Sequence, residues 1–275
     1  MRFAVLIRGV VLLLLLPAWS SLAGASSLGS TPLQRSSGPQ ELLGLLSPAP
    51  PADPTKPPPT RRCPDPPCFD PSAGRTPPAF LRWVGSDVAA FWRKRVEDVP
   101  YRWQPAQEII VQHGQAARSN CLGVVKASNG PFYCARDHPT KVFLPADAIR
   151  SFVLRTPTWG KWRKKDFALA YVVAHEWGHH LQDVLGILRN SHLKSIQIEL
   201  QADCLAGVWS HSTWARGLLQ PGDIPEAIRL ARLAGDTPGT PKNDPSAHGS
   251  PSQRAAWFKR GYNSGKSARC IVPSP

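Results

Sequence analysis

The stretch "AYVVAHEWGHHLQDVLG", Ala170 to Gly186, places three histidines and a glutamate inside a largely apolar segment. Its composition and length predict a helix that begins near Asp166 and is ended by Gly186. Residues four apart on a helix lie about 40° apart around its axis, one turn along. The imidazoles of His175 and His179 are therefore expected to project from the same face.

These two histidines complete an H-E-x-x-H motif, and together they could bind one zinc ion at about 2.0–2.1 Å, the usual Zn–N distance. Glu176 lies about 100° around the helix, where it can reach a water molecule bound to the metal but not easily the metal itself. His180 faces away from His179 by a similar angle, so a structural role is expected for it. Gly178 lowers helix propensity by about 1 kcal/mol, which favours close packing against another backbone. The motif also arises by chance, so further evidence is needed to distinguish a metal site from an ordinary core. The acidic residues that follow in the sequence supply it.

A catalytic zinc site needs a third protein ligand and leaves one position open. The segment "IELQADC" supplies Glu199 and, one turn later, Asp203 on the next predicted helix. A short loop between antiparallel helices would bring Glu199 to the histidines, while Asp203 could accept the Nδ1 hydrogen of one of them and fix its tautomer. Two acids on a solvated helix face are the alternative, but the residues around them are too apolar for such a face. We therefore expect one Zn²⁺ per chain, held by His175, His179 and Glu199.

His248, in "SAHGSPSQR", is the predicted second catalytic residue beside Glu176. It directly precedes a helix with a capping box, whose start could aim the ring at the oxyanion that forms during hydrolysis. A surface loop histidine is the alternative interpretation. Arg254 is expected to assist by charge or by structure, and Tyr171 and Tyr133 are weaker candidate donors.

Residues 1–25 are typical of a secretory signal peptide. Arg2 and Arg8 are basic, Val10–Leu16 is an unbroken apolar run, and Ala23-Gly24-Ala25 offers small residues for cleavage. The run is shorter than the about 20 residues of a transmembrane helix, so cleavage is favoured over an uncleaved anchor. The protein is expected to be secreted or held in the cell envelope, with a single-pass membrane anchor as the alternative.

Residues 26–78 are rich in proline and poor in large apolar side chains, which predicts a disordered linker or stalk. Within it, "ELLGLLS" (Glu41 to Ser47) is an apolar island that could dock on the domain. Residues 79–275 are enough for one domain with its own core. A helix is expected from Ser86, followed by short strands at 108–114, 123–127, 131–135 and 141–145, with further helices after them. The expected fold is therefore α+β, helix-rich with a small β-sheet.

Six cysteines behind an export signal favour disulfides over zinc-cluster ligands, because the chain has no C-x-x-C pair. Spacing favours Cys63–Cys68 in "CPDPPC". It also favours Cys121–Cys134, across a predicted hairpin with an Asn129-Gly130 turn. Cys204 and Cys270 are then left to pair with each other.

The formal net charge is +14, and the basic residues are spread along the chain. Such a surface would attract anionic envelope polymers or lipid weakly. Specific nucleic-acid binding is not expected, since no recognition motif or aromatic platform accompanies the charge. The partner that the motifs predict is a peptide or protein substrate.

Several stretches together resemble the bacterial neutral zinc metallopeptidase family, and more broadly the gluzincins: "HEWGHHLQ", "ELQADCLAGVW", "GPFYCARD", "PGDIPEAI" and "HGSPSQRAAWFKRGY". The resemblance runs from about Phe80 to Cys270. It implies a zincin-like fold, with the same three zinc ligands, Glu176 as the general base and Asp203 as the orienting acid. Substrates of that family are poorly defined, so the resemblance specifies chemistry rather than biology.

The leading hypothesis is thus an exported zinc metallopeptidase that hydrolyses peptide bonds through a zinc-bound water activated by Glu176, with the peptide lying against the sheet edge. A zinc amidase acting on cell-wall peptides is the second hypothesis, and the basic surface suits it. The third is a non-catalytic, zinc-stabilised envelope binding protein, although a structural site has no need of Glu176. A zymogen in which Cys63 or Cys68 covers the zinc is a fourth possibility. A disulfide between the two cysteines explains them more simply.

Overall fold

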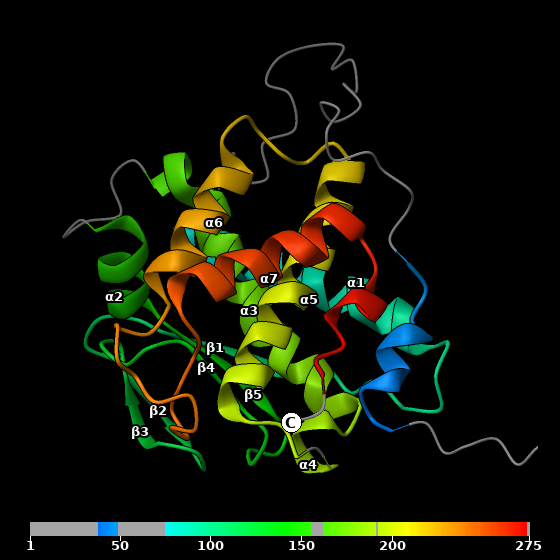
Figure 1. The fold of residues 1–275 in the computed structure, drawn as a ribbon. Coiled ribbons are helices and arrows are strands. Elements are labelled where there is room, and N and C mark those ends of the chain that lie inside the picture. Colours follow the sequence, from blue (N-terminus) through cyan, green and yellow to red (C-terminus); the bar gives the residue numbers. More distant parts are fainter. Residues whose placement is uncertain (1–37, 49–74, 156–161, 191, 274–275) are drawn as a thin grey trace, which may run out of the picture. The chain divides into compact units, whose positions relative to one another are not determined.

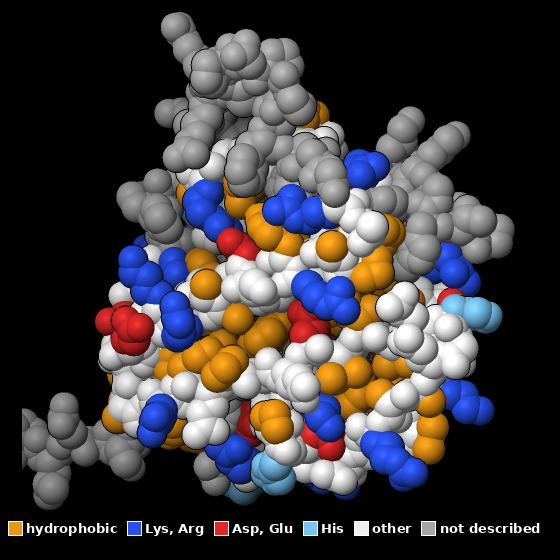
Figure 2. Space-filling model, turned by 180° about the vertical axis from the view of Figure 1, so that it is seen from behind, with side chains coloured by type: hydrophobic (Ala, Val, Ile, Leu, Met, Phe, Trp, Pro, Cys, Tyr) orange, Lys and Arg blue, Asp and Glu red, His pale blue; other side chains and the backbone are white. Residues whose placement is uncertain are grey.

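The computed structural model describes residues 38–48, 75–155, 162–190 and 192–273 (Figure 1). The predicted signal peptide at 1–25, most of the predicted linker at 26–78 and the Cys63–Cys68 pair lie outside these residues. Within the described part, no helix combines the length and hydrophobicity that crossing a membrane requires. Lys and Arg side chains are scattered among hydrophobic and neutral ones on the face that Figure 2 shows.

Helices make up most of the domain, and α3 lies at its centre. Helices α1, α5 and α6 all pack against α3, and α7 lies across α5 (Figure 1). The longer helices are α1 (Pro77–Val96), α3 (Asp166–Val184), α5 (Ser195–Ala215), α6 (Asp223–Leu233) and α7 (Pro251–Ser264). The short ones are η1 (Glu41–Gly44), α2 (Ala146–Ile149), η2 (Arg150–Leu154), η3 (Trp162–Lys165), α4 (Ile187–Asn190) and η4 (Ser267–Cys270).

Two small sheets complete the α+β fold, as the sequence predicted. Strands β1 (Gln107–Val111), β5 (Lys141–Pro145) and β4 (Phe132–Cys134) form one sheet in the order β1-β5-β4. The β1–β5 pair is parallel and the β4–β5 pair is antiparallel. Strands β2 (Ala116–Ser119) and β3 (Gly123–Lys126) form a separate antiparallel pair. Strand β4 is thus an edge strand of the three-stranded sheet, and both β4 and β5 contact α3.

Two local predictions were wrong. The Asn129-Gly130 turn does not close a hairpin, because β3 pairs with β2 and β4 pairs with β5. The side chain of Asn129 accepts the Lys126 N–H at 2.7 Å, and Pro131 has no N–H to donate to a ladder. The first helix begins at Pro77, not at Ser86, since proline fits the first turn of a helix and the apolar residues before Ser86 are needed for packing.

The central helix is buried along nearly its whole length, which explains its continuous apolar sequence. It ends where predicted, with Gly186 in the left-handed region at φ 74°. Both remaining cysteine pairings are present. Cys121–Cys134 ties the end of the β2–β3 pair to β4, and Cys204–Cys270 ties α5 to η4.

Helices α5 and α7 approach so closely that neither tolerates a side chain at the contact. A Cβ at Gly207 would overlap the Phe258 carbonyl, and one at Gly261 would overlap the Cys204 carbonyl. Glycine at both positions lets the two backbones touch. This contact fixes the position of α7 relative to the residues that follow Glu199 on α5.

The apolar island of the predicted linker docks on the domain as part of a short docked segment, Gly38–Pro48. Leu42, Leu43 and Leu46 are buried in the main core. The segment packs beside η4, at the opposite end of the sequence. At its far end, the Ser47 hydroxyl donates a hydrogen bond to the Asp98 carboxylate.

Candidate active site

The site is built where α3 crosses α5. A Cβ on Gly178 would lie 3.2 Å from the Ala202 carbonyl oxygen and 3.3 Å from the Ala202 Cα, so only glycine permits this approach without displacement. The close packing expected at Gly178 is therefore present. Glu199 lies three residues before Ala202 and Asp203 directly follows it, so the crossing brings both acids next to the histidines of α3.

Two histidines and one acid converge at the crossing. His175 Nε2 lies 3.2 Å from Glu199 Oε2, and His179 Nε2 lies 3.3 Å from Glu199 Oε1. One donor atom from each of the three residues lies within 4.8 Å of the others, the arrangement of a metal site. Both imidazoles engage their Nδ1 atoms elsewhere, so both Nε2 atoms face the shared point. Two imidazoles and a carboxylate around one point suit zinc.

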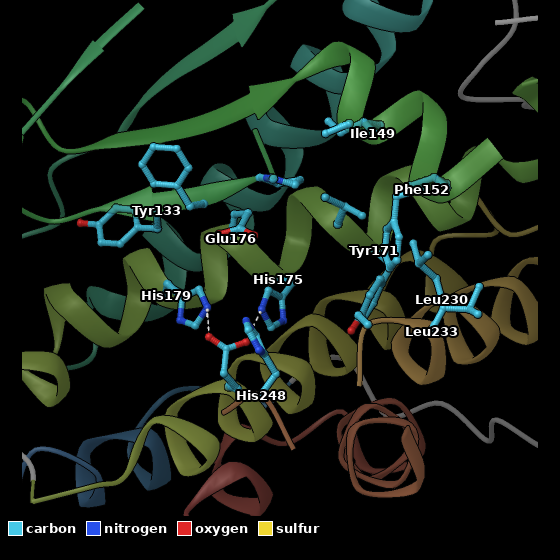
Figure 3. Close-up of a pocket in the computed structure, with 18 of the residues that line it drawn as sticks. Tyr133, Ile149, Phe152, Tyr171, His175, Glu176, His179, Leu230, Leu233 and His248 are labelled. Atoms are coloured by element: carbon cyan, nitrogen blue, oxygen red, sulfur yellow. Dashed lines mark hydrogen bonds and ion pairs between the residues drawn. The ribbon is translucent and has the colours of Figure 1, made fainter. Parts of the chain in front are cut away.

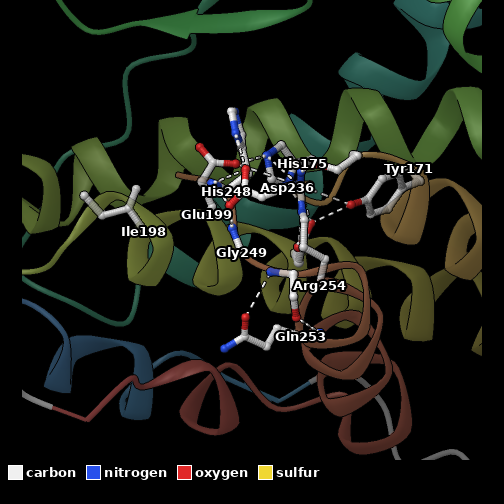
Figure 4. A network of polar contacts seen from close by, with 12 residues as sticks. Tyr171, His175, Ile198, Glu199, Asp236, His248, Gly249, Gln253 and Arg254 are labelled. Atoms are coloured by element: carbon white, nitrogen blue, oxygen red, sulfur yellow. Dashed lines mark hydrogen bonds and ion pairs between the residues drawn. The ribbon is translucent and has the colours of Figure 1, made fainter. Parts of the chain in front are cut away.

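The Nδ1 of His175 is held by a charged cluster. It lies 2.9 Å from Asp203 Oδ1, and Asp203 is completely buried. Arg254, from α7, donates to both carboxylate oxygens of Asp203 at 2.8 and 2.9 Å (Figure 4). The Tyr171 hydroxyl donates to Asp203 Oδ1 at 2.5 Å. Although burial opposes ionisation, Arg254 and His175 hold the pKa of Asp203 below its usual value.

The Nδ1 of His179 is held by neutral amides instead. It donates to Gln182 Oε1 at 2.8 Å. Gln182 Nε2 donates to the Ile198 carbonyl at 2.8 Å and to Gln201 Oε1 at 3.0 Å. Gln201 Nε2 in turn donates to Gln40 of the docked segment and to the Cys270 carbonyl, at 3.2 and 3.1 Å. We call Gln182, Gln201 and Gln40 the amide chain.

The amide chain was not predicted from the sequence. One signal for it was present, since Gln182 follows His179 by three residues and shares its helix face. Nothing in the sequence placed Gln201 or Gln40 beside Gln182. Their positions depend on the α3–α5 crossing and on the docking of Gly38–Pro48.

Glu176 is buried beside the two histidines, and its carboxyl group lines the same cleft. Burial raises the pKa of Glu176, and the charges of His175 and His179 oppose that rise. The same two histidines hold the pKa of Glu199 well below its usual range, although burial acts in the opposite direction. The two glutamates therefore have opposite tendencies. Glu199 stays ionised, whereas Glu176 holds a proton more readily.

The other predicted residues occupy different positions around the site. His248 lines the cleft with about half of its side chain exposed, and its backbone N–H donates to the Asp236 carboxylate at 2.9 Å. Tyr171 and Tyr133 also line the cleft, but both hydroxyls are engaged. Tyr171 donates to Asp203, and Tyr133 donates to Asp183 at 2.7 Å.

His180 lies outside the metal constellation, as its position on the helix predicted. Its ring packs edge-on against Trp103 and Trp177, with centroids 4.7 and 5.3 Å apart. Its Nδ1 lies 3.2 Å from the Tyr133 hydroxyl. Burial lowers the pKa of His180 to about 4, so this ring is neutral and serves as part of the core.

The cleft that these residues line has a volume of about 960 Å³. Its two ends differ in character (Figure 3). His175, His179 and His248 lie together at one end. Apolar side chains from α2, η2 and α6 line the other end: Ile149, Phe152, Leu230 and Leu233.

A second group of acids lies apart from the cleft. Oxygen atoms of Asp166, Asp223 and Glu226 fall within 4.8 Å of one another. Burial and the neighbouring Asp166 raise the pKa of Glu226 to about 7. The group contains no imidazole and lines no part of the cleft.

The family described as putative neutral zinc metallopeptidase matches residues 70–272 of this chain. The chain belongs to this family. The zinc peptidase description of the family agrees with the site, in which His175, His179 and Glu199 converge on one point. No solved structure shows a significant match to the chain.

The curated relatives that match the chain are named as uncharacterized proteins. Uncharacterized protein YpfJ of Escherichia coli K12 is 35% identical over 197 residues, which is 65% of this chain and 65% of that protein. Uncharacterized protein Rv2575 of Mycobacterium tuberculosis H37Rv is 32% identical over 234 residues, or 74% of this chain and 75% of that protein. The chain thus spans just under two thirds of the E. coli relative.

Proposed function

We propose that this protein is an exported zinc peptidase that hydrolyses peptide bonds in the cleft between α3 and β4. The observation that carries the proposal is the convergence of His175 Nε2, His179 Nε2 and a Glu199 carboxylate oxygen beside the buried Glu176. The signal-like sequence of residues 1–25 supports export.

The three converging residues would hold the zinc ion. When bound, zinc supplies Lewis acidity, which polarises a carbonyl group and lowers the pKa of a water ligand. Asp203 and Gln182 keep a hydrogen atom on each Nδ1, so that the Nε2 lone pairs remain available.

Glu176 is the proposed general base. Its carboxylate would take a proton from the attacking water, whose oxygen forms the new bond to the scissile carbonyl carbon. It would then deliver that proton to the nitrogen of the leaving amine as the C–N bond breaks. A base of this kind needs a pKa closer to neutrality than that of an exposed glutamate, and burial shifts Glu176 in that direction.

His248 is the proposed donor to the oxyanion. Its backbone is fixed by Asp236, and its half-exposed ring lies at the metal end of the cleft (Figure 3). The alternative donors are occupied, since the Tyr171 and Tyr133 hydroxyls each donate to a carboxylate. Arg254 is likewise committed to Asp203 and acts as its counterion.

The free edge of β4 is the proposed site for the peptide backbone. In the described part of the chain, β4 pairs with β5 on one side and with no strand on the other, and Phe132 and Tyr133 line the cleft. An extended peptide could add to this edge as a further strand. A bulky apolar side chain of the substrate would then fit between η2 and α6, where charged groups would be desolvated without a partner.

Amidase action on cell-wall peptides is the second candidate function. The net charge of +14 favours it, because a basic surface would concentrate an enzyme weakly on anionic wall polymers or lipid. Digestion of casein set against release of wall fragments separates the two substrates. A non-catalytic zinc-binding protein is less consistent with the site, since Glu176 would then have no function beside the metal.

The Glu176→Gln variant tests the proposal. We expect one zinc per chain in both proteins by metal analysis, and cleavage of a peptide library by the wild type alone. Glutamine preserves size and hydrogen bonding but cannot accept the proton. Turnover by the variant would remove Glu176 from the mechanism, whereas loss of zinc from the variant would make it a ligand.

A further inference from the structure

We propose that Gln40, in the docked segment Gly38–Pro48, is a positioning residue of the metal site, because its side chain holds the outer end of the amide chain that orients His179. The inference rests on the proposed zinc site. It assigns a positioning role to residues that precede the domain predicted from the sequence.

The amide chain has only one possible orientation along its inner half. The Ile198 carbonyl can only accept a hydrogen bond, so it draws the NH₂ group of Gln182 toward it at 2.8 Å. The oxygen of Gln182 must then face His179, whose Nδ1 must carry the hydrogen. The tautomer that presents Nε2 to the metal is therefore fixed by an amide rather than by an acid.

The outer half of the amide chain is held from both ends of the protein. Gln201 is fully buried, and its NH₂ group donates to the Cys270 carbonyl and to Gln40 Oε1. Gln40 Oε1 accepts a second hydrogen bond, from the Val272 backbone at 3.1 Å. Because a backbone N–H can only donate, it forces Gln40 to present its oxygen to Gln201.

Different residues of the docked segment attach it to the domain and position the amide chain. Leu42, Leu43 and Leu46 anchor it in the core, and Ser47 bonds to Asp98 at its far end. Gln40 adds one further attachment, the hydrogen bond from the Val272 N–H, and it alone of these residues reaches the buried amide of Gln201. Removing Gln40 would leave one hydrogen atom of that amide without its acceptor, and the resulting freedom of Gln201 would pass to Gln182 and then to the imidazole of His179.

The test compares three variants of the full chain: Gln40→Ala, Gln40→Glu and Ser47→Ala. Zinc affinity is measured by competition with a chromophoric chelator, and the d–d absorption of the cobalt-substituted protein reports ligand geometry. Gln40→Ala should weaken zinc binding about two- to tenfold, less than the 10- to 100-fold typical for direct partners of a ligand histidine. Glutamate keeps both acceptor functions, so Gln40→Glu should stay within about twofold of the wild type.

Ser47→Ala is the matched control, since it removes a hydrogen bond of the same docked segment that does not lead to His179. It should leave zinc affinity and the cobalt spectrum unchanged. The inference is overturned if Gln40→Ala binds zinc as the wild type does, or if Ser47→Ala or Gln40→Glu weakens binding equally. Failure of the wild type to bind zinc would instead refute the proposed metal site itself.

Discussion

His175 and His179 project from the same helix toward the same acid, yet their far sides meet opposite kinds of chemistry. His175 donates to Asp203, whose charge is balanced by the buried guanidinium of Arg254. His179 donates to Gln182, the first of a row of uncharged amides. Both arrangements fix the same tautomer, so the difference lies in what happens when a member is lost.

On the His175 side, the support depends on two charged residues, Asp203 and Arg254. Removing either Asp203 or Arg254 takes from the other its bidentate partner of opposite charge in the interior, which costs far more than one lost hydrogen bond. An amide chain distributes its contribution, because each lost link leaves neutral groups unsatisfied at about 1–3 kcal/mol. The comparison therefore predicts that substitutions on the His175 side cause large losses of zinc affinity and stability, and that substitutions on the His179 side cause smaller ones.

The largest effect is expected for Asp203→Ala. It removes the acceptor of His175 and strands Arg254 in the interior, so zinc affinity should fall about 100-fold and the free energy of unfolding by about 3–5 kcal/mol. Chelator competition and urea unfolding of the metal-free protein measure the two quantities separately. A loss of stability below about 1 kcal/mol would contradict the charged-support account.

The double change Asp203→Leu with Arg254→Met is the control for that variant. It removes both charges at once, and well-packed apolar replacements of a buried pair are often neutral for stability. We expect unfolding to recover toward the wild type while zinc affinity stays low. Recovery of both would mean that His175 needs no acceptor at Nδ1.

A smaller effect is expected for Gln182→Met, which breaks the first link on the other side. Zinc affinity should fall about tenfold, since the His179 Nδ1–H loses its acceptor. Gln182→Glu is the matched variant, because it keeps that acceptor and loses only the donors to Ile198 and Gln201. It should lose stability with a smaller loss of zinc affinity. If both variants lost affinity equally, the amide would act on packing and not on the imidazole.

The last prediction concerns Glu108, a carboxyl whose ionisation burial disfavours, in contrast to that of Asp203. Glu108 is largely buried beside Trp177, and burial raises its pKa from 4.5 to about 7, which the neighbouring Trp177 and the charge of Arg82 only partly oppose. Between these pH values the unfolded chain loses the proton first, so the free energy of unfolding falls as pH rises, by up to about 3 kcal/mol.

Glu108→Gln removes this dependence. Relative to the wild type, the variant should gain stability at pH 8 and gain little at pH 4.5, where the wild-type residue is protonated in the folded state and about half protonated in the unfolded chain. Urea unfolding at the two pH values provides the measurement. An equal difference at both pH values would show that folding leaves the pKa of Glu108 unshifted.

Local periodicity was enough to predict the inner part of the site. The i, i+4 spacing of His175 and His179 fixes their shared face, and the apolar residues around Glu199 and Asp203 require that helix to be buried. Gly178 even indicated the close crossing that joins the two helices. These features are encoded within a single helix or at its contact surface.

Contacts between segments that are far apart in the chain could not be predicted from the sequence. The hairpin signal at Asn129-Gly130 is local, whereas the pairing of β4 with β5 depends on a ladder formed further along the chain. Arg254 was expected to assist, but its bond to Asp203 requires the placement of α7 on α5. Glutamines such as Gln40 and Gln201 carry no periodic or charge signal, so only their juxtaposition reveals a role.

The glycine contact between α5 and α7 sets the distance between the two helix axes, and the geometry of the metal site depends on that distance. A methyl group on Gly261 would act as a wedge against the Cys204 carbonyl, directly after Asp203 in the sequence. Because Arg254 lies about two turns earlier on the same helix, lifting α7 would draw its guanidinium away from that acid. Mutational sensitivity should therefore extend to residues that touch neither the cleft nor the ion, wherever a hydrogen atom in place of a side chain sets the spacing.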